Sequence, residues 1–222
     1  MFEAVFFDLD GTLVDSAPGV DFAAQAAWAA VRPGAPCPPM RPLMGPPLRE
    51  MLRRALPGVK ELVIVALERS FRAAYDSEGW MKTTPFPGVK EALTDLKRRK
   101  VSCLGVTNKL GLPTRNILAH CGMDQFFEAF VSPDSRQPVF ASKTEATLSL
   151  LELEEISPAT ACFVGDTMED ARAAQECGLW FAAYAGGYGW EEIQAQMPGV
   201  PRFEHFSGLV SLLEDRGGRL KC

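Results

Sequence analysis

Residues 4–13 read AVFFDLDGTL, an apolar run followed by Asp8, Asp10 and Gly11. Such a run predicts a buried strand, and two carboxylates two residues apart on an extended chain point to the same side. In a crevice they repel unless a proton or a cation such as Mg²⁺ lies between them. Gly11 would let the turn approach a phosphate and offer it N–H donors. The alternative is an ordinary surface turn, because Asp-Gly is a common turn pair.

Further apolar runs end in small or polar residues and alternate with helical patterns. The predicted strands are Ala4–Phe7, Val101–Val106, Ala129–Val131, Ala161–Val164 and Trp180–Tyr184. The predicted helices are Val89–Arg99, Thr114–Cys121, Lys143–Leu151 and Glu169–Cys177; Gly122 and Gly178 follow two of them as caps. Strands of this kind are typical of a parallel sheet. The fold class expected is therefore α/β, a doubly wound, Rossmann-like parallel sheet with its crevice at the carboxyl ends of the strands.

One stretch interrupts this alternation. Residues 11–106 separate the first acidic pair from the next polar strand end, whereas a crossover needs only about a dozen residues. The stretch contains helical patterns at 17–31, 48–56 and 60–76 and a cluster of prolines between the first two. Ser16 is the expected N-cap of the first helix. We predict an inserted all-helical cap domain at 16–84 and a core formed by 1–15 and 85–222.

Two further strand or helix ends carry candidate phosphate ligands. Thr107 and Asn108 follow a strand, where a hydroxyl and an amide could hydrogen-bond a phosphoryl group; an ordinary strand end is the alternative. Lys143 opens a helix, where its charge could neutralise both a phosphate and an attacking carboxylate. The alternative for Lys143 is a solvated lysine.

A second acidic pair, Asp166 and Asp170, begins the last predicted helix. Asp166 would face a cation, and Asp170 lies on the same helical face four residues later. The alternative is purely structural, because Thr167 and Asp170 also have capping-box spacing. The four motifs occur in order along the chain, three of them at strand ends, and this combination favours a phosphoryl-transfer site.

These motifs resemble those of the haloacid dehalogenase superfamily of hydrolases over nearly the whole chain. In order, the matching motifs are Asp8-x-Asp10-Gly11-Thr12, Thr107-Asn108, Lys143 and Gly165-Asp166-x-x-x-Asp170. Residues 8–18 (DLDGTLVDSAP) and 86–89 resemble the phosphoglycolate-phosphatase-like branch, which carries a helical cap after the first motif. One departure is Lys143-Thr144, where the family usually has Lys-Pro.

The resemblance implies a role for each matching residue. Asp8 would be the nucleophile and Asp10 the general acid/base. Mg²⁺ would be held by Asp8, by Asp10 through its main-chain carbonyl and by Asp166, with Asp170 in support. The phosphate ligands would be Thr107, Asn108 and Lys143, beside Gly11, which was expected there from its turn, and Thr107 and Lys143 also count as catalytic. The implied function is a magnesium-dependent phosphatase that hydrolyses small phosphate monoesters through an aspartyl-phosphate, with phosphoglycolate-like substrates favoured.

Composition limits the partners. The chain has 222 residues and a net charge of -5, so we expect no nucleic-acid surface. No apolar run has the roughly 18–20 residues of a membrane span, and the start of the sequence lacks signal-peptide features. The six cysteines form no metal or redox motif. We expect a cytoplasmic enzyme, monomer or homodimer, that acts on a small phosphorylated metabolite.

Other functions remain open at this point. A sugar phosphomutase of the same family would return the phosphoryl group to a second hydroxyl. A phospho-accepting signalling receiver also uses an aspartate, a Thr or Ser and a lysine, but it has no cap. A phosphonatase would need a cap lysine, for which only Lys60 and Lys82 are present.

The predicted cap is the basic part of an acidic chain, with nine Lys or Arg against six Asp or Glu. Four of its arginines lie near the proline-rich turn: Arg41, Arg49, Arg53 and Arg54. Arginine pairs well with a carboxylate or a second phosphate, so these residues predict a substrate with another anionic group. The alternative is a solvated helix face.

Overall fold

A six-stranded parallel sheet forms the centre of the protein, whose computed structural model describes residues 2–219. In the spatial order β5-β4-β1-β6-β7-β8, the strands are Ala129–Val131, Ser102–Val106, Ala4–Phe7, Ala161–Gly165, Trp180–Tyr184 and Arg202–Phe203. In the register of the sheet, Phe7 of β1 lies between Gly105 of β4 and Val164 of β6. The predicted doubly wound α/β core is therefore confirmed.

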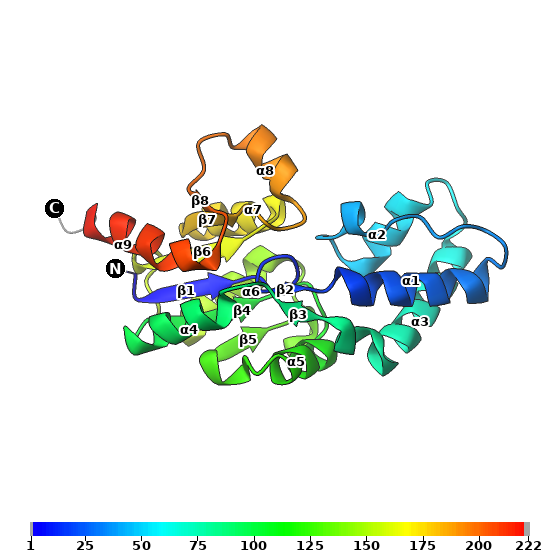
Figure 1. Ribbon diagram of the computed structural model, residues 1–222, viewed down its shortest axis with the longest axis horizontal. Coiled ribbons are helices and arrows are strands. Elements are labelled where there is room, and N and C mark those ends of the chain that lie inside the picture. The colour runs from blue at the N-terminus through cyan, green and yellow to red at the C-terminus, as the bar shows by residue number, and fades with distance from the viewer. Residues whose placement is uncertain (1, 220–222) are drawn as a thin grey trace.

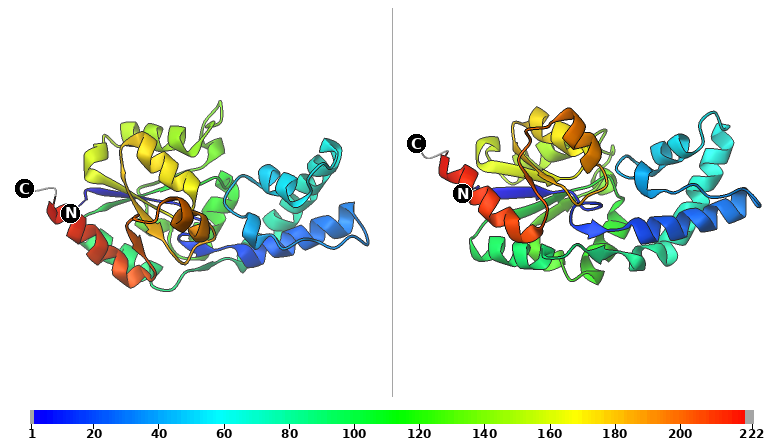
Figure 2. Two further views of the ribbon diagram at one scale, coloured as in Figure 1. Left: turned by 90° about the horizontal axis from the view of Figure 1, so that it is seen from above. Right: turned by 45° about the horizontal axis from the view of Figure 1, so that its top comes forward.

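Helices cover both faces of the sheet (Figure 1). On one face lie α4 (Val89–Arg98), α5 (Gly111–His120) and α9 (Leu209–Arg219), and on the other α6 (Lys143–Leu153), α7 (Met168–Cys177) and α8 (Trp190–Gln196). Figure 2, left, shows α6 and α7 on the opposite side of the sheet from α4 and α9. Because side chains alternate along a strand, Val5 and Phe7 pack into one hydrophobic cluster and Ala4 and Phe6 into the other. This burial on both faces explains the continuous apolar run of β1.

The helical segment, residues 16–83, extends from one end of the sheet (Figure 1). It contains α1 (Ala17–Val31), η1 (Arg41–Leu43), α2 (Leu48–Ala55), α3 (Glu61–Ser77) and η2 (Gly79–Lys82). The short strands β2 (Val14–Asp15) and β3 (Thr84–Pro85) flank it and pair antiparallel. The segment has its own hydrophobic cluster, in which Trp28, Leu52 and Leu67 are fully buried.

Several helix ends differ from the predictions. Ser16 is the N-cap residue of α1, as predicted, but its hydroxyl makes no capping hydrogen bond; instead, the Ser16 N–H donates to Tyr188 Oη. Helix α5 begins at Gly111, three residues before the predicted Thr114. Gly178 does cap α7 in the left-handed conformation, with φ of 73°.

Within the described residues, no helix combines the length and apolar character needed to span a membrane.

Candidate active site

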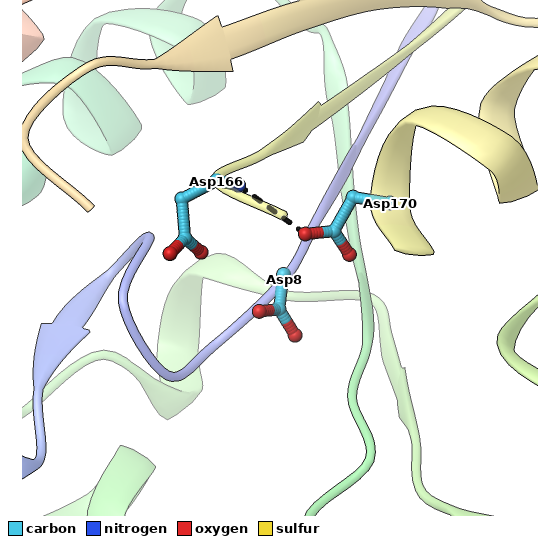
Figure 3. Close-up of side chains that lie close together, drawn as sticks. All are labelled: Asp8, Asp166 and Asp170. Atoms are coloured by element: carbon cyan, nitrogen blue, oxygen red, sulfur yellow. Dashed lines mark hydrogen bonds between the residues drawn. The ribbon is translucent and has the colours of Figure 1, made fainter. Parts of the chain in front are cut away.

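The first and fourth motifs meet at the carboxyl edge of the sheet. Since β1 and β6 are neighbours, the residues that follow them lie side by side. The carboxylates of Asp8, Asp166 and Asp170 each offer an oxygen, and these oxygens lie within 4.8 Å of one another. All three residues are buried, and Figure 3 shows their carboxylates gathered in one place. The structure thus brings together three acids, of which the first, Asp8, and the last, Asp170, are more than 150 positions apart in the sequence.

Lys143 supplies a positive charge to this cluster. Its Nζ lies 2.9 Å from Asp8 Oδ1 and 2.6 Å from Asp170 Oδ1. Lys143 is the first residue of α6, whose N-cap Ser142 accepts a hydrogen bond from the Glu145 N–H. Burial by itself lowers the pKa of Lys143, but the charges of Asp170 and Asp8 raise it above its ordinary value. The lysine is therefore a buried cation beside Asp8 rather than a solvated side chain.

Asp166 is held by hydrogen bonds on both carboxylate oxygens. Its Oδ1 accepts from Thr12 Oγ1 at 2.7 Å, and its Oδ2 accepts from the Tyr188 N–H at 2.7 Å and the Gly189 N–H at 3.4 Å. Burial, with a contribution from the charge of Asp170, nevertheless raises the pKa of Asp166 to about 7. Burial also raises the pKa of Asp8, although Lys143 opposes this shift.

Burial is the main cause of the raised pKa values of Asp8 and Asp166, and the charges of the neighbouring carboxylates add to it. Carboxylate oxygens are the hard ligands that Mg²⁺ prefers. A divalent cation among these oxygens would offset the repulsion, so the residues present fit a magnesium site.

Asp170 both contacts the site and caps a helix, the two alternatives that the sequence left open. Its Oδ2 accepts from the Thr167 N–H, from Thr167 Oγ1 and from the Asp166 N–H, which completes a capping box at the start of α7. Its other oxygen binds Lys143. The capping geometry therefore fixes the carboxylate that orients the lysine.

Gly11 differs from its predicted role as a phosphate ligand. Its N–H donates to the carbonyl of Val14 at 2.9 Å and is not free for a phosphate. Its φ is +88°, and a Cβ at this position would collide with Asp166 Oδ2 and with the Tyr188 ring. The glycine is required because the turn passes against Asp166 in a left-handed conformation.

Asp10 lies outside the three-carboxylate cluster and faces a second lysine. Asp10 Oδ1 is 3.2 Å from Lys109 Nζ, and the same Nζ donates to Tyr75 Oη at 3.0 Å. Tyr75 belongs to α3, so Lys109 connects Asp10 to the helical segment. The charge of Asp10, followed by that of Tyr75, raises the pKa of Lys109 against the effect of burial.

The second motif also contacts the helical segment. Asn108 Nδ2 donates to Glu169 Oε2 at 2.8 Å and to the carbonyl of Gly45 at 3.4 Å. Thr107 Oγ1 accepts from the Lys109 N–H at 3.2 Å. These contacts orient Asn108 and Lys109 at the junction between the sheet and the helices.

A pocket of about 320 Å³ lies at this junction. From the core it is lined by Asp10, Thr107, Asn108 and Lys143, among others, and the opposite wall comes from the helical segment. None of the four arginines predicted to bind a second anion lines the pocket, and each is paired with an acidic residue. The pairs are Arg41–Asp15, Arg49–Glu68, Arg53–Glu61 and Arg54–Glu50. The structure therefore favours the alternative of a solvated, ion-paired surface.

Residues 5–184 match the family model of haloacid dehalogenase-like hydrolases. The chain belongs to this family. Among its relatives is a protein named phosphoglycolate phosphatase from Psychrobacter arcticus, 29% identical, with 95% of each chain covered. Another is phosphoglycolate phosphatase 1 from Pseudomonas aeruginosa, 33% identical, with 83% of this chain and 70% of the relative covered.

Other relatives have a different name or show only the fold. A protein named tyrosine-protein kinase PtkA from Mycobacterium tuberculosis is 33% identical over 84% of this chain, which spans 63% of the length of that relative. The structure of a predicted phosphoglycolate phosphatase from Haemophilus somnus superposes with a TM-score of 0.83 at 25% identity, covering 95% of this chain and 97% of the other. A hydrolase of the haloacid dehalogenase-like family from Streptococcus pneumoniae has the same fold, with a TM-score of 0.84 at 23% identity over 95% and 97% of the two chains.

Sequence reasoning missed two residues of this haloacid dehalogenase-like hydrolase. Lys109 directly follows the second motif, but a lysine after a strand end is usually solvated. Tyr188 holds Asp166 through its N–H, while its hydroxyl donates to Asp15 Oδ1 and accepts from the Ser16 and Ala17 N–H groups. The only signal for Tyr188 was its place in the glycine-rich stretch after β7.

Proposed function

We propose that this hydrolase is a magnesium-dependent phosphatase that cleaves small phosphate monoesters through an aspartyl-phosphate on Asp8. The observation that carries the proposal is the buried contact of 2.9 Å between Asp8 and Lys143, beside Asp166 and Asp170. A carboxylate nucleophile next to a fixed cation is suited to phosphoryl transfer. The names of the phosphatase relatives support the same reaction.

Asp8 and Asp166, with the main-chain carbonyl of Asp10, would hold the Mg²⁺, and Asp170 would support them by orienting Lys143. When bound, the ion supplies positive charge that offsets the carboxylates and the phosphate. We also propose that the helical segment is a cap domain, because its residues form one wall of the pocket.

The reaction proceeds in two displacements on phosphorus. A carboxylate oxygen of Asp8 forms a bond to phosphorus as the bond to the alcohol oxygen breaks, and Asp10 gives its proton to the leaving oxygen. Water then attacks the phosphoryl group, Asp10 accepts the proton of that water, and the bond between phosphorus and Asp8 breaks to release phosphate. Lys143, with Thr107 and Asn108, would hold the phosphoryl oxygens throughout.

The test is phosphate release from a panel of small monoesters, measured with Mg²⁺ and after removal of divalent ions with a chelator. Phosphoglycolate is included because the names of the relatives indicate it. We expect release that requires Mg²⁺, while circular dichroism remains that of a folded protein. Full activity after chelation, or no release from any ester, would contradict the proposal. Transfer of the phosphoryl group to a second hydroxyl without free phosphate would indicate a mutase or a kinase instead.

A further inference from the structure

The wall of the pocket opposite the motif residues is apolar. It is formed by side chains from α1, from the stretch before α2, from α2 and from α3: Val20, Met44, Pro46, Leu48, Met51 and Phe71. Phe140 and Pro113 continue this surface on the core side. Val20, Met51 and Phe71 are almost fully buried, whereas Met44 and Leu48 are half-buried. The apolar wall, defined by the six residues of the helical segment, therefore has accessible side chains that a ligand can cover.

Each basic side chain of the pocket already contacts a protein carboxylate. Among the described residues that line it, the basic side chains are those of Arg72, Lys109 and Lys143. Arg72 Nη2 lies 2.8 Å from Glu68 Oε1, a carboxylate that Arg49 also contacts, and the two lysines pair with the site aspartates. Asp76 and Glu169 also line the pocket and add negative charge. A second anionic group on a substrate would thus lie near these acids and apolar atoms, and it would have to compete with protein carboxylates for the cations of the pocket.

The apolar wall stands close to the reacting groups in this structure. Asn108 Nδ2 donates to the carbonyl of Gly45, which adjoins Met44 in the chain. Lys109, paired with Asp10, donates to Tyr75, which stacks on Phe71 with ring centroids 5.7 Å apart. These two contacts hold the apolar wall against the second motif. The part of a substrate beyond its phosphate would therefore lie on apolar side chains.

We propose that the alcohol portion of the substrate is apolar, aliphatic or aromatic, and carries no second acid. The inference rests on the phosphatase function proposed above and names the substrate class of the same site. Covering apolar surface favours such esters, and burying a carboxylate without a partner opposes esters such as phosphoglycolate. The likeness to phosphoglycolate phosphatases then concerns the chemistry of phosphate cleavage and not the group that is released.

The first experiment compares matched esters with the purified protein and Mg²⁺. Ethyl, butyl and hexyl phosphate release alcohols of similar acidity, so a difference in kcat/KM reports contact with the pocket. We expect kcat/KM to rise at least about tenfold across this series. Propyl phosphate is close in size to phosphoglycolate, and we expect it to be preferred by about tenfold or more.

The second experiment changes one residue of the apolar wall. In Leu48→Arg, a cation replaces a half-buried apolar side chain, and we expect the preference for propyl phosphate over phosphoglycolate to fall by about tenfold. Leu62→Arg is the matched control, because Leu62 is 80% exposed and lies outside the pocket lining. Thermal unfolding of both variants verifies that they are folded.

The outcomes separate this inference from the proposed function. Release of phosphate from all esters, with phosphoglycolate preferred or with no dependence on chain length, overturns the apolar-substrate inference alone. An equal change of preference in the Leu48 and Leu62 variants overturns the role of the apolar wall. No release from any ester overturns the phosphatase function and this inference together.

Discussion

The two walls of the pocket are built in different ways. On the core wall, the ammonium of Lys143 is held by Asp8 and Asp170, and the carboxylates of Asp166 and Asp170, which lie outside the pocket lining, each have several polar partners. On the apolar wall, side chains such as Met44 and Leu48 are half-buried and line open space. The polar contacts on the core side hold the side chains in one geometry, as a chemical step requires. The apolar wall, by contrast, tolerates replacement of one apolar side chain by another. The difference indicates that reaction and substrate preference are encoded in separate parts of the chain.

Asp8→Asn is expected to have the largest effect, and it tests whether reaction and substrate preference are separate. We expect turnover of every ester to fall at least about 10³-fold, because the proposed nucleophile is lost while the shape of the side chain is kept. The loss should be the same for apolar and acidic substrates if the core wall acts on the phosphate alone. The measurement is phosphate release from protein whose mass excludes deamidation back to aspartate. Substantial activity in such protein would contradict the covalent mechanism.

Lys109→Met breaks the contact that joins the two walls. Removal of the cation leaves Asp10 and Tyr75 without their common partner, and we expect kcat to fall about tenfold, a fraction of what a general acid contributes. KM should change less than about threefold, because Lys109 positions Asp10 and need not touch the substrate.

Two further variants sharpen this prediction. Tyr75→Phe removes one hydrogen bond and keeps the ring over which Lys109 lies, so its effect should be smaller. Lys60→Met, at an exposed position before α3, is the control for loss of a positive charge. A loss of activity as large in the Lys60 variant would indicate a general charge effect.

Tyr188→Phe tests the support of the core wall. The change leaves the Ser16 N–H without its acceptor, and we expect the free energy of unfolding to fall by about 1–2 kcal/mol. Denaturant-induced unfolding measures the effect. Tyr184→Phe is a suitable control, because the Tyr184 hydroxyl has no side-chain hydrogen bond within residues 2–219. Equal losses in both variants would assign the effect to packing.

The smallest effect is expected from the surface arginines of the helical segment. Alanine at all four positions, Arg41, Arg49, Arg53 and Arg54, should change kcat/KM for phosphoglycolate less than about twofold, because exposed ion pairs contribute little and none of these residues lines the pocket. A selective loss of activity toward phosphoglycolate would restore the role that their sequence positions suggested.

Local patterns predicted much of the core. The bounds of β1, β5 and β7 match those expected, because β1 and β5 are short apolar runs between polar residues and β7 is an apolar run that leads into a glycine-rich stretch. The two-residue strands β2, β3 and β8 have no such pattern and depend on their partners. Their existence therefore could not be predicted from local sequence.

In the site, too, the residues with a local sequence pattern were predictable and those that depend on distant partners were not. Asp8, Lys143, Asp166 and Asp170 stand at strand or helix ends, where topology forces them together. The roles of Lys109 and Tyr188 arise from contacts with residues 34 and 172 positions away. The acidic partners of the four arginines could not be predicted, because sequence gives the charge of a side chain but not the acid that neutralises it.

The ribbon of β2 and β3 has a consequence for how such enzymes diverge. Asp15 and Thr84 are direct partners across the ribbon, so the chain leaves the core and returns to it about one strand spacing apart. The positions at which the chain leaves and re-enters the core are thus set by the ribbon and not by the length of the segment between them. A lineage could therefore exchange this segment by recombination and keep the proposed catalytic acids, provided that the new segment replaces the contact between Tyr75 and Lys109.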